Sequence, residues 1–270
     1  MPREFFRSAE AAAAWRRGAA QRAQFLTKVT ELMLDEARIG PGTRVLDIGT
    51  GTGDTALLAA DRVGPAERVI AIDASAEMLE VATEAAREAC LANIEFRRMD
   101  GGNLQLEAAS VDAVIGRHAM QFLDDWPAPL AGFHRVLRPG GRLSFITWAP
   151  IHENPFMALP VTIPRALGWT TASLNARPFD LSDSEALHRQ LINAGFDEVH
   201  VQRVAFETRM PLDDAIANRL DSPMSRSVIS DLSPEQRTTF QAAIRSAVAR
   251  MRVGSEAVVS GASLLASGTR

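Results

Sequence analysis

The stretch Arg44-Val45-Leu46-Asp47-Ile48-Gly49-Thr50-Gly51-Thr52-Gly53-Asp54 decides the fold of this chain. Its first half can form a buried strand, its second half alternates three glycines, and an Ala/Leu-rich helical pattern follows at once. The pattern predicts a strand, a tight turn and a helix. Glycines permit the turn and let a ligand approach the backbone, and the free N–H groups of the helix face that turn. This arrangement is typical of a nucleotide-binding site.

The glycine spacing distinguishes between two classes of nucleotide. A dinucleotide would place its pyrophosphate at the start of the helix, and its fingerprint is G-x-G-x-x-G/A. Here Gly49, Gly51 and Gly53 alternate, and Asp54 takes the last place, where it would repel a pyrophosphate. Asp47, at the end of the strand, suits an ammonium group because a carboxylate accepts hydrogen bonds from a cation. We therefore expect S-adenosylmethionine, which carries an ammonium and a sulfonium and no phosphate.

The sequence also resembles a known family. Val-Leu-Asp-Ile-Gly-Thr-Gly-Thr-Gly at 45–53 is similar to the first motif of class I S-adenosylmethionine-dependent methyltransferases. Residues 69–73 resemble the second strand with its terminal acid, 111–115 the fourth strand, and 135–143 the turn into the fifth. Four motifs in order are a much stronger signal than one glycine motif. The resemblance covers about residues 40 to 205 and is closest to the ubiquinone/menaquinone and natural-product small-molecule methyltransferases.

The resemblance implies an α/β fold: a Rossmann-like seven-stranded sheet with an antiparallel last strand, flanked by helices and carrying helical lid insertions. The expected organisation is 1–39, an N-terminal helical segment that is partly lid; 40–149, the cofactor-binding core; 150–180, a first lid insertion; 181–209, a core helix and strand; 210–252, a second lid insertion; and 253–270, the final strand. Both insertions are rich in apolar side chains, which favours short helices over a pocket and not a solvated linker.

Periodicity and capping signals predict the individual elements. We expect helices at 8–37, 54–62 and 76–90, strands near 45–48, 68–72, 94–98, 111–115, 142–147 and 196–206, and an antiparallel strand at 256–267 between strands five and six. Ser75 is expected to cap its helix, Asp124 or Asp125 the helix after strand four, and Ser182 and Ser233 to open helices through capping boxes. Residues 8–20 either pack on the outer sheet edge or form part of a lid over the cofactor through Trp15, and we favour the lid.

Composition excludes several classes of protein. The net charge is −4 and no basic cluster is visible, which disfavours a nucleic-acid partner. No apolar run is long enough to span a membrane and no signal peptide is recognisable, so we expect a cytoplasmic protein. The single cysteine, Cys90, cannot form an intrachain disulfide and is expected to be a small buried residue. The absence of tyrosine excludes a short-chain dehydrogenase, the scattered histidines disfavour zinc, and we expect no metal.

The methyltransferase resemblance implies a set of cofactor-binding positions. Asp73 should accept the ribose hydroxyls, and Asp100 and Gly101 should bind the adenine edge, while Met78 either contacts the adenine ring or is a core residue. Arg117 holds the cofactor carboxylate or a substrate acid, or else is a surface residue. The candidate cofactor-binding residues are Asp47, Gly49, Thr50, Gly51, Gly53, Asp73, Ala74, Met78, Asp100, Gly101, Arg117 and Gln121.

Methyl transfer from a sulfonium needs alignment and exclusion of water more than a catalytic constellation. His118 follows strand four, beside the expected methyl position, and is the candidate base. The alternative, that His118 positions the substrate without moving a proton, is favoured. His152 is a weaker candidate at the start of the first insertion.

We therefore predict an enzyme that moves a methyl group to oxygen or carbon of a hydrophobic or aromatic small molecule. The alternative is a protein of this fold that uses bound S-adenosylmethionine for a non-methylating reaction or serves as a noncatalytic partner. A nicotinamide oxidoreductase is a distant third.

Overall fold

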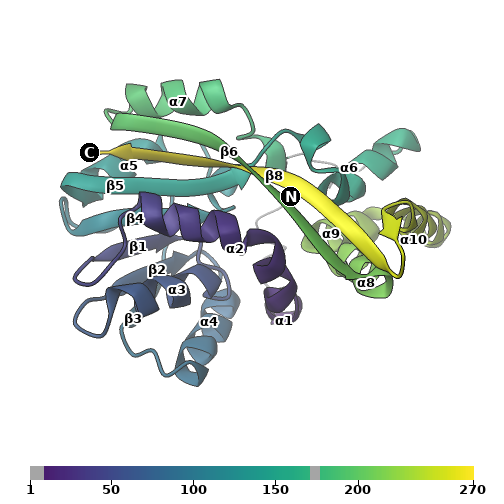
Figure 1. Cartoon of the computed structure of the whole chain (residues 1–270), viewed down its shortest axis with the longest axis horizontal. Helices are drawn as coiled ribbons and strands as arrows, with labels where there is room; N and C mark the ends of the chain where they lie inside the picture. Colours follow the sequence, from purple (N-terminus) through teal and green to yellow (C-terminus); the bar gives the residue numbers. More distant parts are fainter. Residues whose placement is uncertain (1–8, 171–176) are drawn as a thin grey trace.

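The computed structural model describes residues 9–170 and 177–270, which build a twisted sheet with helices on both faces (Figure 1). The strands are β1 (Val45–Ile48), β2 (Val69–Asp73), β3 (Ile94–Arg98), β4 (Val111–Arg117), β5 (Leu137–Trp148), β6 (Asp197–Pro211), β7 (Arg252–Val253) and β8 (Glu256–Thr269). Their order is β3-β2-β1-β4-β5-β8-β6, and β7 pairs with β8 outside this path. Strands β1 to β5 are parallel, while β8 is antiparallel to both β5 and β6. The expected sheet is confirmed, with β7 as a short addition.

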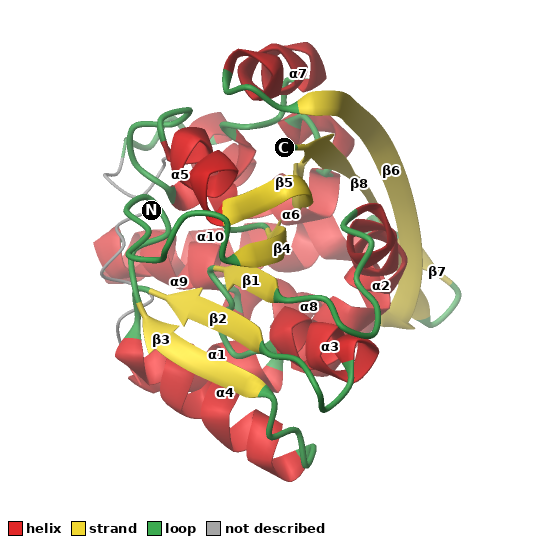
Figure 2. Ribbon diagram, turned by 90° about the vertical axis from the view of Figure 1, so that its left-hand side faces the viewer, coloured by secondary structure: helices red, strands yellow, loops and turns green. Residues whose placement is uncertain are grey.

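Helices cover both faces of this sheet. They are α1 (Ala9–Arg17), α2 (Ala19–Glu36), α3 (Asp54–Val63), α4 (Ala76–Glu88), α5 (Pro129–Val136), α6 (Pro155–Ala166), α7 (Ser184–Asn193), α8 (Leu212–Asp221), α9 (Pro223–Asp231) and α10 (Pro234–Ala249), with short 3-10 turns η2 (Met120–Phe122), η3 (Ile151–Glu153) and η4 (Arg177–Phe179). Figure 2 shows α2 and α3 on one side of the sheet and α5 on the other. Successive side chains of a strand point to opposite faces of the sheet and belong to two hydrophobic cores. Val45 packs with α2 and α3 in one core, and Leu46 packs with α5 and α7 in the other.

Local signals fix the starts of several helices as the sequence predicts. The Ser75 hydroxyl accepts a hydrogen bond from Met78 N at 3.1 Å and caps α4. At α10, Ser233 and Gln236 form a reciprocal capping box, with Pro234 in the first turn. These caps satisfy N–H groups that have no partner inside the helix, so they define where each helix begins.

The segment predicted to be helical over 8–37 forms two helices separated at Gly18, and residue 8 lies outside the described residues. Three expectations about caps and burial are wrong. Helix α5 begins only at Pro129, because Asp125 has a φ of 53° and Asp124 pairs with Arg177 instead of capping.

The remaining two errors concern a cap and the cysteine. Asp183, not Ser182, caps α7 by accepting hydrogen bonds from Glu185 N and Ala186 N, both at 3.0 Å. Cys90 is exposed, because α4 ends at Glu88 and the chain then turns through a left-handed conformation.

Strands β6 and β8 extend far beyond the rest of the sheet. Strand β8 pairs with β5 only from Ser263 to Thr269, whereas its pairing with β6 continues to Glu256. The two strands therefore form a two-stranded arm whose far end carries α8 to α10 (Figure 1). Buried Asn154 fixes the point of departure, since it donates to Ala149 O and accepts from Ala262 N.

The helices on the arm meet the N-terminal helix. Helix α1 packs against core helix α4 and against α9, and α6 packs against α8 and α10. Arg16 of α1 is anchored to Glu88 at the end of α4 by an ion pair of 2.7 Å. Within residues 9–170 and 177–270, no helix is long and apolar enough to cross a membrane.

Candidate functional site

The glycine loop between β1 and α3 forms one wall of the site. Gly49 has a φ of 65°, and a Cβ atom there would lie 2.5 Å from the Cβ of Ala119. Gly51 has a φ of 55°, and a Cβ atom there would project toward the indole Nε1 of Trp15, at 3.6 Å. Both positions need a residue without a side chain, and at Gly51 the missing side chain leaves space between the loop and α1.

The loop opens into a cavity of about 510 Å3 at the carboxyl ends of the parallel strands. It is lined by eleven of the candidate residues: Gly49, Thr50, Gly51, Asp73, Ala74, Met78, Asp100, Gly101, Arg117, His118 and Gln121. Asp47 and Gly53 are not lining residues, although Asp47 directly precedes the lining residues Ile48 and Gly49. The structure therefore brings together positions from four strand ends that are far apart in the sequence.

Asp73 is fixed at the tip of β2 by backbone groups. Its Oδ2 accepts a hydrogen bond from Gly51 N and its Oδ1 one from Ser75 N, both at 2.9 Å. Burial raises the pKa of the Asp73 carboxyl, and the N–H groups of Ser75, Gly51 and Ala74 oppose that rise. The carboxylate is thus held in one orientation, facing the cavity beside the glycine loop.

Asp47 is a buried carboxyl group with an unused oxygen. Only 1% of the residue is exposed, and Oδ2 has no hydrogen-bond partner. Burial raises the pKa of Asp47 to about 7, although the positive charge of Arg117 opposes this rise. A buried acid without a partner is costly to ionise, and a cationic ligand would remove that cost.

Unpartnered buried polar atoms concentrate around this cavity. Of the eight buried side-chain nitrogen and oxygen atoms without a hydrogen-bond partner in the described residues, five belong to residues that line it. They are Thr50 Oγ1, His118 Nδ1, His118 Nε2, Gln121 Oε1 and Arg219 Nε, and a sixth, Asp47 Oδ2, belongs to the residue just before the lining residue Ile48. Because buried polar groups in folded proteins almost always have partners, this cluster indicates a site for a polar ligand. A phosphate-free, cationic adenosine derivative fits both the acids and the glycine wall.

His118 lies in the loop after β4, with a φ of 53°. Its ring stacks on Trp148 at a centroid separation of 3.9 Å and an angle of 16°. Part of the residue remains accessible, yet both ring nitrogens are buried and unpartnered. Burial, with the nearby charge of Arg117, lowers the pKa of His118 well below its usual value, so the imidazole is neutral near pH 7.

Comparison with known proteins agrees with this geometry. Residues 45–141 match the family model described as "Methyltransferase domain". The chain is 31% identical over 206 residues to the nocamycin O-methyltransferase of Saccharothrix syringae, an alignment that covers 72% of this chain and 73% of the relative. The chain belongs to the class I S-adenosylmethionine-dependent methyltransferases.

Solved structures show the same fold at lower identity. The YcgJ protein of Bacillus subtilis superposes with a TM-score of 0.60 at 22% identity, covering 89% of this chain and 97% of that one. Phosphoethanolamine N-methyltransferase 2 of Haemonchus contortus, solved with S-adenosyl-L-methionine, gives a TM-score of 0.57 at 18% identity, covering 90% and 52%. S-adenosylmethionine is the cosubstrate of this chain. Within residues 9–170 and 177–270, no group of three or more His, Cys, Asp or Glu side chains could hold a metal ion.

Arg117 of the methyltransferase is held by protein groups in this structure. It donates to Asp54 Oδ2 at 3.0 Å and to the Thr30 hydroxyl at 3.2 Å. This pair explains the acid at the start of α3, because Arg117 balances the Asp54 charge at the edge of the cavity. The two partners are 63 residues apart, so the sequence offers no local signal for their contact.

His152 lies away from the cavity. It is an exposed residue of η3 and lines a separate hollow with residues of α6 and α10. Adjacent Glu153 forms an ion pair with Arg203. The structure therefore brings His118, but not His152, to the methyltransferase cavity.

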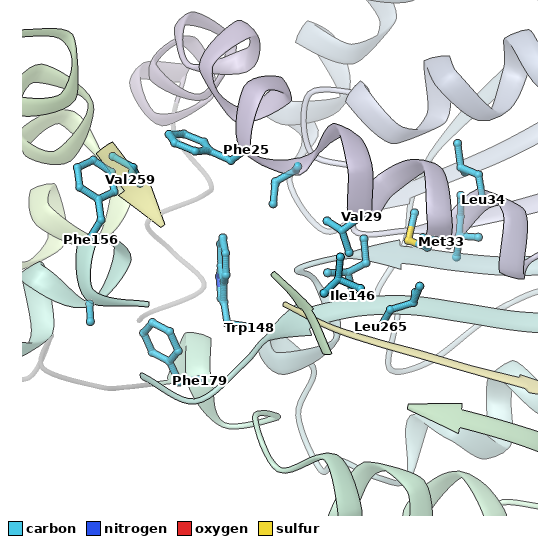
Figure 3. Close-up of a cluster of buried hydrophobic side chains, with 14 of the residues drawn as sticks. Phe25, Val29, Met33, Leu34, Ile146, Trp148, Phe156, Phe179, Val259 and Leu265 are labelled. Atoms are coloured by element: carbon cyan, nitrogen blue, oxygen red, sulfur yellow. The ribbon is translucent and has the colours of Figure 1, made fainter. Parts of the chain in front are cut away.

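Phe25, Trp148 and Arg219 are among the cavity residues that sequence reasoning missed. Figure 3 shows Trp148 among Phe25, Phe156 and Phe179, in the larger hydrophobic core. Arg219 could have been found, because Leu212, Ala215, Ile216 and Arg219 share a helical face and the first three are apolar. An arginine on such a face is a signal for a buried charge.

Proposed function

We propose that this methyltransferase transfers the methyl group of S-adenosylmethionine to an oxygen or carbon atom of a hydrophobic or aromatic small molecule. The observation that carries the proposal is the two-part lining of the cavity. Its acidic part, Asp73 beside the glycine loop, suits the nucleoside, and its other part is lined by apolar side chains. The latter are Phe25, Leu26, Trp148, Met157 and Met224. A volume of about 510 Å3 lies in the range of small-molecule sites.

Five of the candidate cofactor-binding residues have a proposed task. Asp73 accepts the ribose hydroxyls and Met78 lies against the adenine ring, while Asp100 and the N–H of Gly101 bind the adenine edge. Asp47 balances the ammonium group. When bound, S-adenosylmethionine supplies an activated methyl group on a sulfonium.

The remaining task is to align the acceptor and exclude water, and it falls to the apolar lining. His118 is proposed to position the acceptor, because its neutral ring can accept a hydrogen bond from a hydroxyl group. Its lowered pKa makes it a weak base, which supports positioning over proton removal. The net charge of −4 and a cavity of about 510 Å3 support a small-molecule acceptor over a nucleic acid.

The experiment is to incubate the purified chain with S-adenosylmethionine and a panel of hydroxy-aromatic compounds, and to analyse the products by mass spectrometry. We expect at least one product heavier by one CH2 group, together with S-adenosylhomocysteine. Calorimetry with S-adenosylmethionine is measured first. Binding without methylation of any member of the panel contradicts the proposed acceptor class, and absence of binding contradicts the cofactor site.

A further inference from the structure

The apolar part of the cavity contains one charge that the proposed function does not use. Arg219 of α8 is 3% exposed and lines the cavity. Its carbonyl oxygen accepts hydrogen bonds from the hydroxyls of Ser222 and Ser225, at 2.9 and 2.6 Å. The backbone at Arg219 is therefore fixed near the end of α8, in the wall of the cavity.

The guanidinium has weak partners and an unused edge. Nη1 donates to Phe156 O and contacts Met157 Sδ, both at 3.3 Å, and the group lies 5.2 Å from the centre of the Phe156 ring. Nε and Nη2 form no hydrogen bond in the described residues. These two nitrogens make up the edge of a guanidinium that binds a carboxylate through two parallel hydrogen bonds.

Among the residues that the structure describes, no acid of the cavity is paired with this arginine. The acids that line the cavity have other partners: Asp54 has Arg117, Asp73 has the N–H groups of Gly51 and Ser75, Asp100 has the N–H of Gly102, and Asp221 has Arg226. Burial lowers the pKa of Arg219 to about 10, so the group still carries its charge at neutral pH. A buried charge without a counter-ion is unfavourable, and an anionic ligand would compensate it.

We infer that the methyl acceptor is an organic anion, an apolar or aromatic body bearing a carboxylate that binds the Nε–Nη2 edge of Arg219. This inference rests on the proposed function and narrows its acceptor class. The apolar body packs against Phe25, Trp148 and Met224, which line the same cavity. The carboxylate is the anchor, and the reacting atom faces the glycine loop.

The test uses the full chain saturated with S-adenosylhomocysteine, and two probes of equal shape. These are 2-naphthoate, which is an anion, and 2-naphthamide, which is neutral. Calorimetry in a buffer without carboxylates or phosphate compares the wild type, Arg219→Met, Arg219→Lys and the control Arg245→Met, which removes an exposed charge of α10 outside the cavity.

We expect the wild type and Arg245→Met to bind 2-naphthoate more tightly than 2-naphthamide by about tenfold or more. Arg219→Met should abolish this preference without changing the affinity for 2-naphthamide, and Arg219→Lys should keep part of it, because lysine retains the charge but not the planar edge. Circular dichroism and thermal unfolding confirm that each variant is folded.

Several results overturn the inference. They are equal binding of the two probes, tighter binding of the amide, no binding of 2-naphthoate, or a preference that survives in Arg219→Met. Affinity for S-adenosylhomocysteine is measured alone in every variant. A loss of about tenfold or more in Arg219→Met would assign the arginine to the cofactor carboxylate and reject the acceptor anchor. Failure of the wild type to bind S-adenosylhomocysteine would instead contradict the proposed function.

Discussion

Replacing Asp47 by asparagine tests the proposed cation site through the stability of the ligand-free chain. Burial raises the pKa of Asp47 from 3.8 to about 7, and one pKa unit corresponds to about 1.4 kcal/mol. Keeping this carboxylate charged at pH 8 therefore costs the folded state about 4 kcal/mol. The pKa of Asp47 is higher in the folded chain than in the unfolded chain, so its protonated form contributes to the free energy of unfolding. That contribution is fully present below about pH 4 and is lost as the pH rises through about 7. Between pH 5 and pH 8 the loss is about 2–3 kcal/mol.

Urea unfolding of the ligand-free wild type, Asp47→Asn and Asp61→Asn at pH 5 and pH 8 measures this loss. We expect the free energy of unfolding of Asp47→Asn to increase by about 2–3 kcal/mol relative to the wild type between pH 5 and pH 8. Asp61 is exposed on α3, so its variant removes the same charge and should follow the wild-type trend. Comparing differences between two pH values cancels the constant cost of the unpaired amide.

The pH dependence of S-adenosylmethionine binding is a second measure of the ionisation of Asp47. Between pH 5.5 and 6.5 the ammonium of S-adenosylmethionine stays protonated while Asp47 ionises, so the wild-type affinity should rise by up to about tenfold. The affinity of Asp47→Asn should be weak and independent of pH over this interval. Parallel unfolding trends for wild type and Asp47→Asn, together with parallel binding curves, would refute the assignment of Asp47 as a buried, cation-binding acid.

Three further changes test other parts of the structure. Asp73→Ala should weaken S-adenosylmethionine binding by about tenfold or more in calorimetry, because it removes both acceptors for the ribose, and an unchanged affinity would reject that role. Phe240→Ala should lower the free energy of unfolding by about 3–5 kcal/mol in urea, since Phe240 is fully buried on α10, whereas exposed Thr239→Ala should have little effect. The free energy of unfolding of the wild type should fall below about pH 6.5, because the pKa of His118 is lowered in the folded chain and the unfolded chain therefore binds the proton first. His118→Gln should reduce this fall, and identical pH profiles of the two proteins would contradict the prediction.

The sequence predicts those parts of the fold that depend on local signals. The strand, glycine loop and helix of 45–63 form as expected, as do the Ser75 cap and the Ser233 capping box. Where two neighbouring residues compete for one task, local signals are insufficient. The serine at 182 and the aspartate after it are both good caps, and only the observed backbone decides that Asp183 accepts the hydrogen bonds.

Long-range features could not be derived from sequence patterns. The pairing of Arg117 with Asp54 joins β4 to α3, and its effect on the cavity charge depends on their relative positions. Likewise, β6 was expected to end near 206, but it continues to Pro211 because β8 supplies a partner along its whole length. The candidate cofactor residues were located through motifs. Arg219 belongs to an insertion without a motif, and although its helical face indicates a buried charge, its contact with Phe156 depends on packing between two insertions.

The two-stranded arm has a consequence for how this enzyme can diversify. The chain leaves the sheet along β6, forms α8 to α10, and returns along β8, so residues 212–252 are attached through adjacent ends of one hairpin. The residues proposed to bind the nucleoside precede this segment, while Arg219 lies within it. Insertions or exchanges at the hairpin tip can therefore change the part of the cavity that contains Arg219 without replacing the residues proposed to bind the nucleoside. Such separation permits one half of the molecule to vary rapidly while the other stays under strict selection.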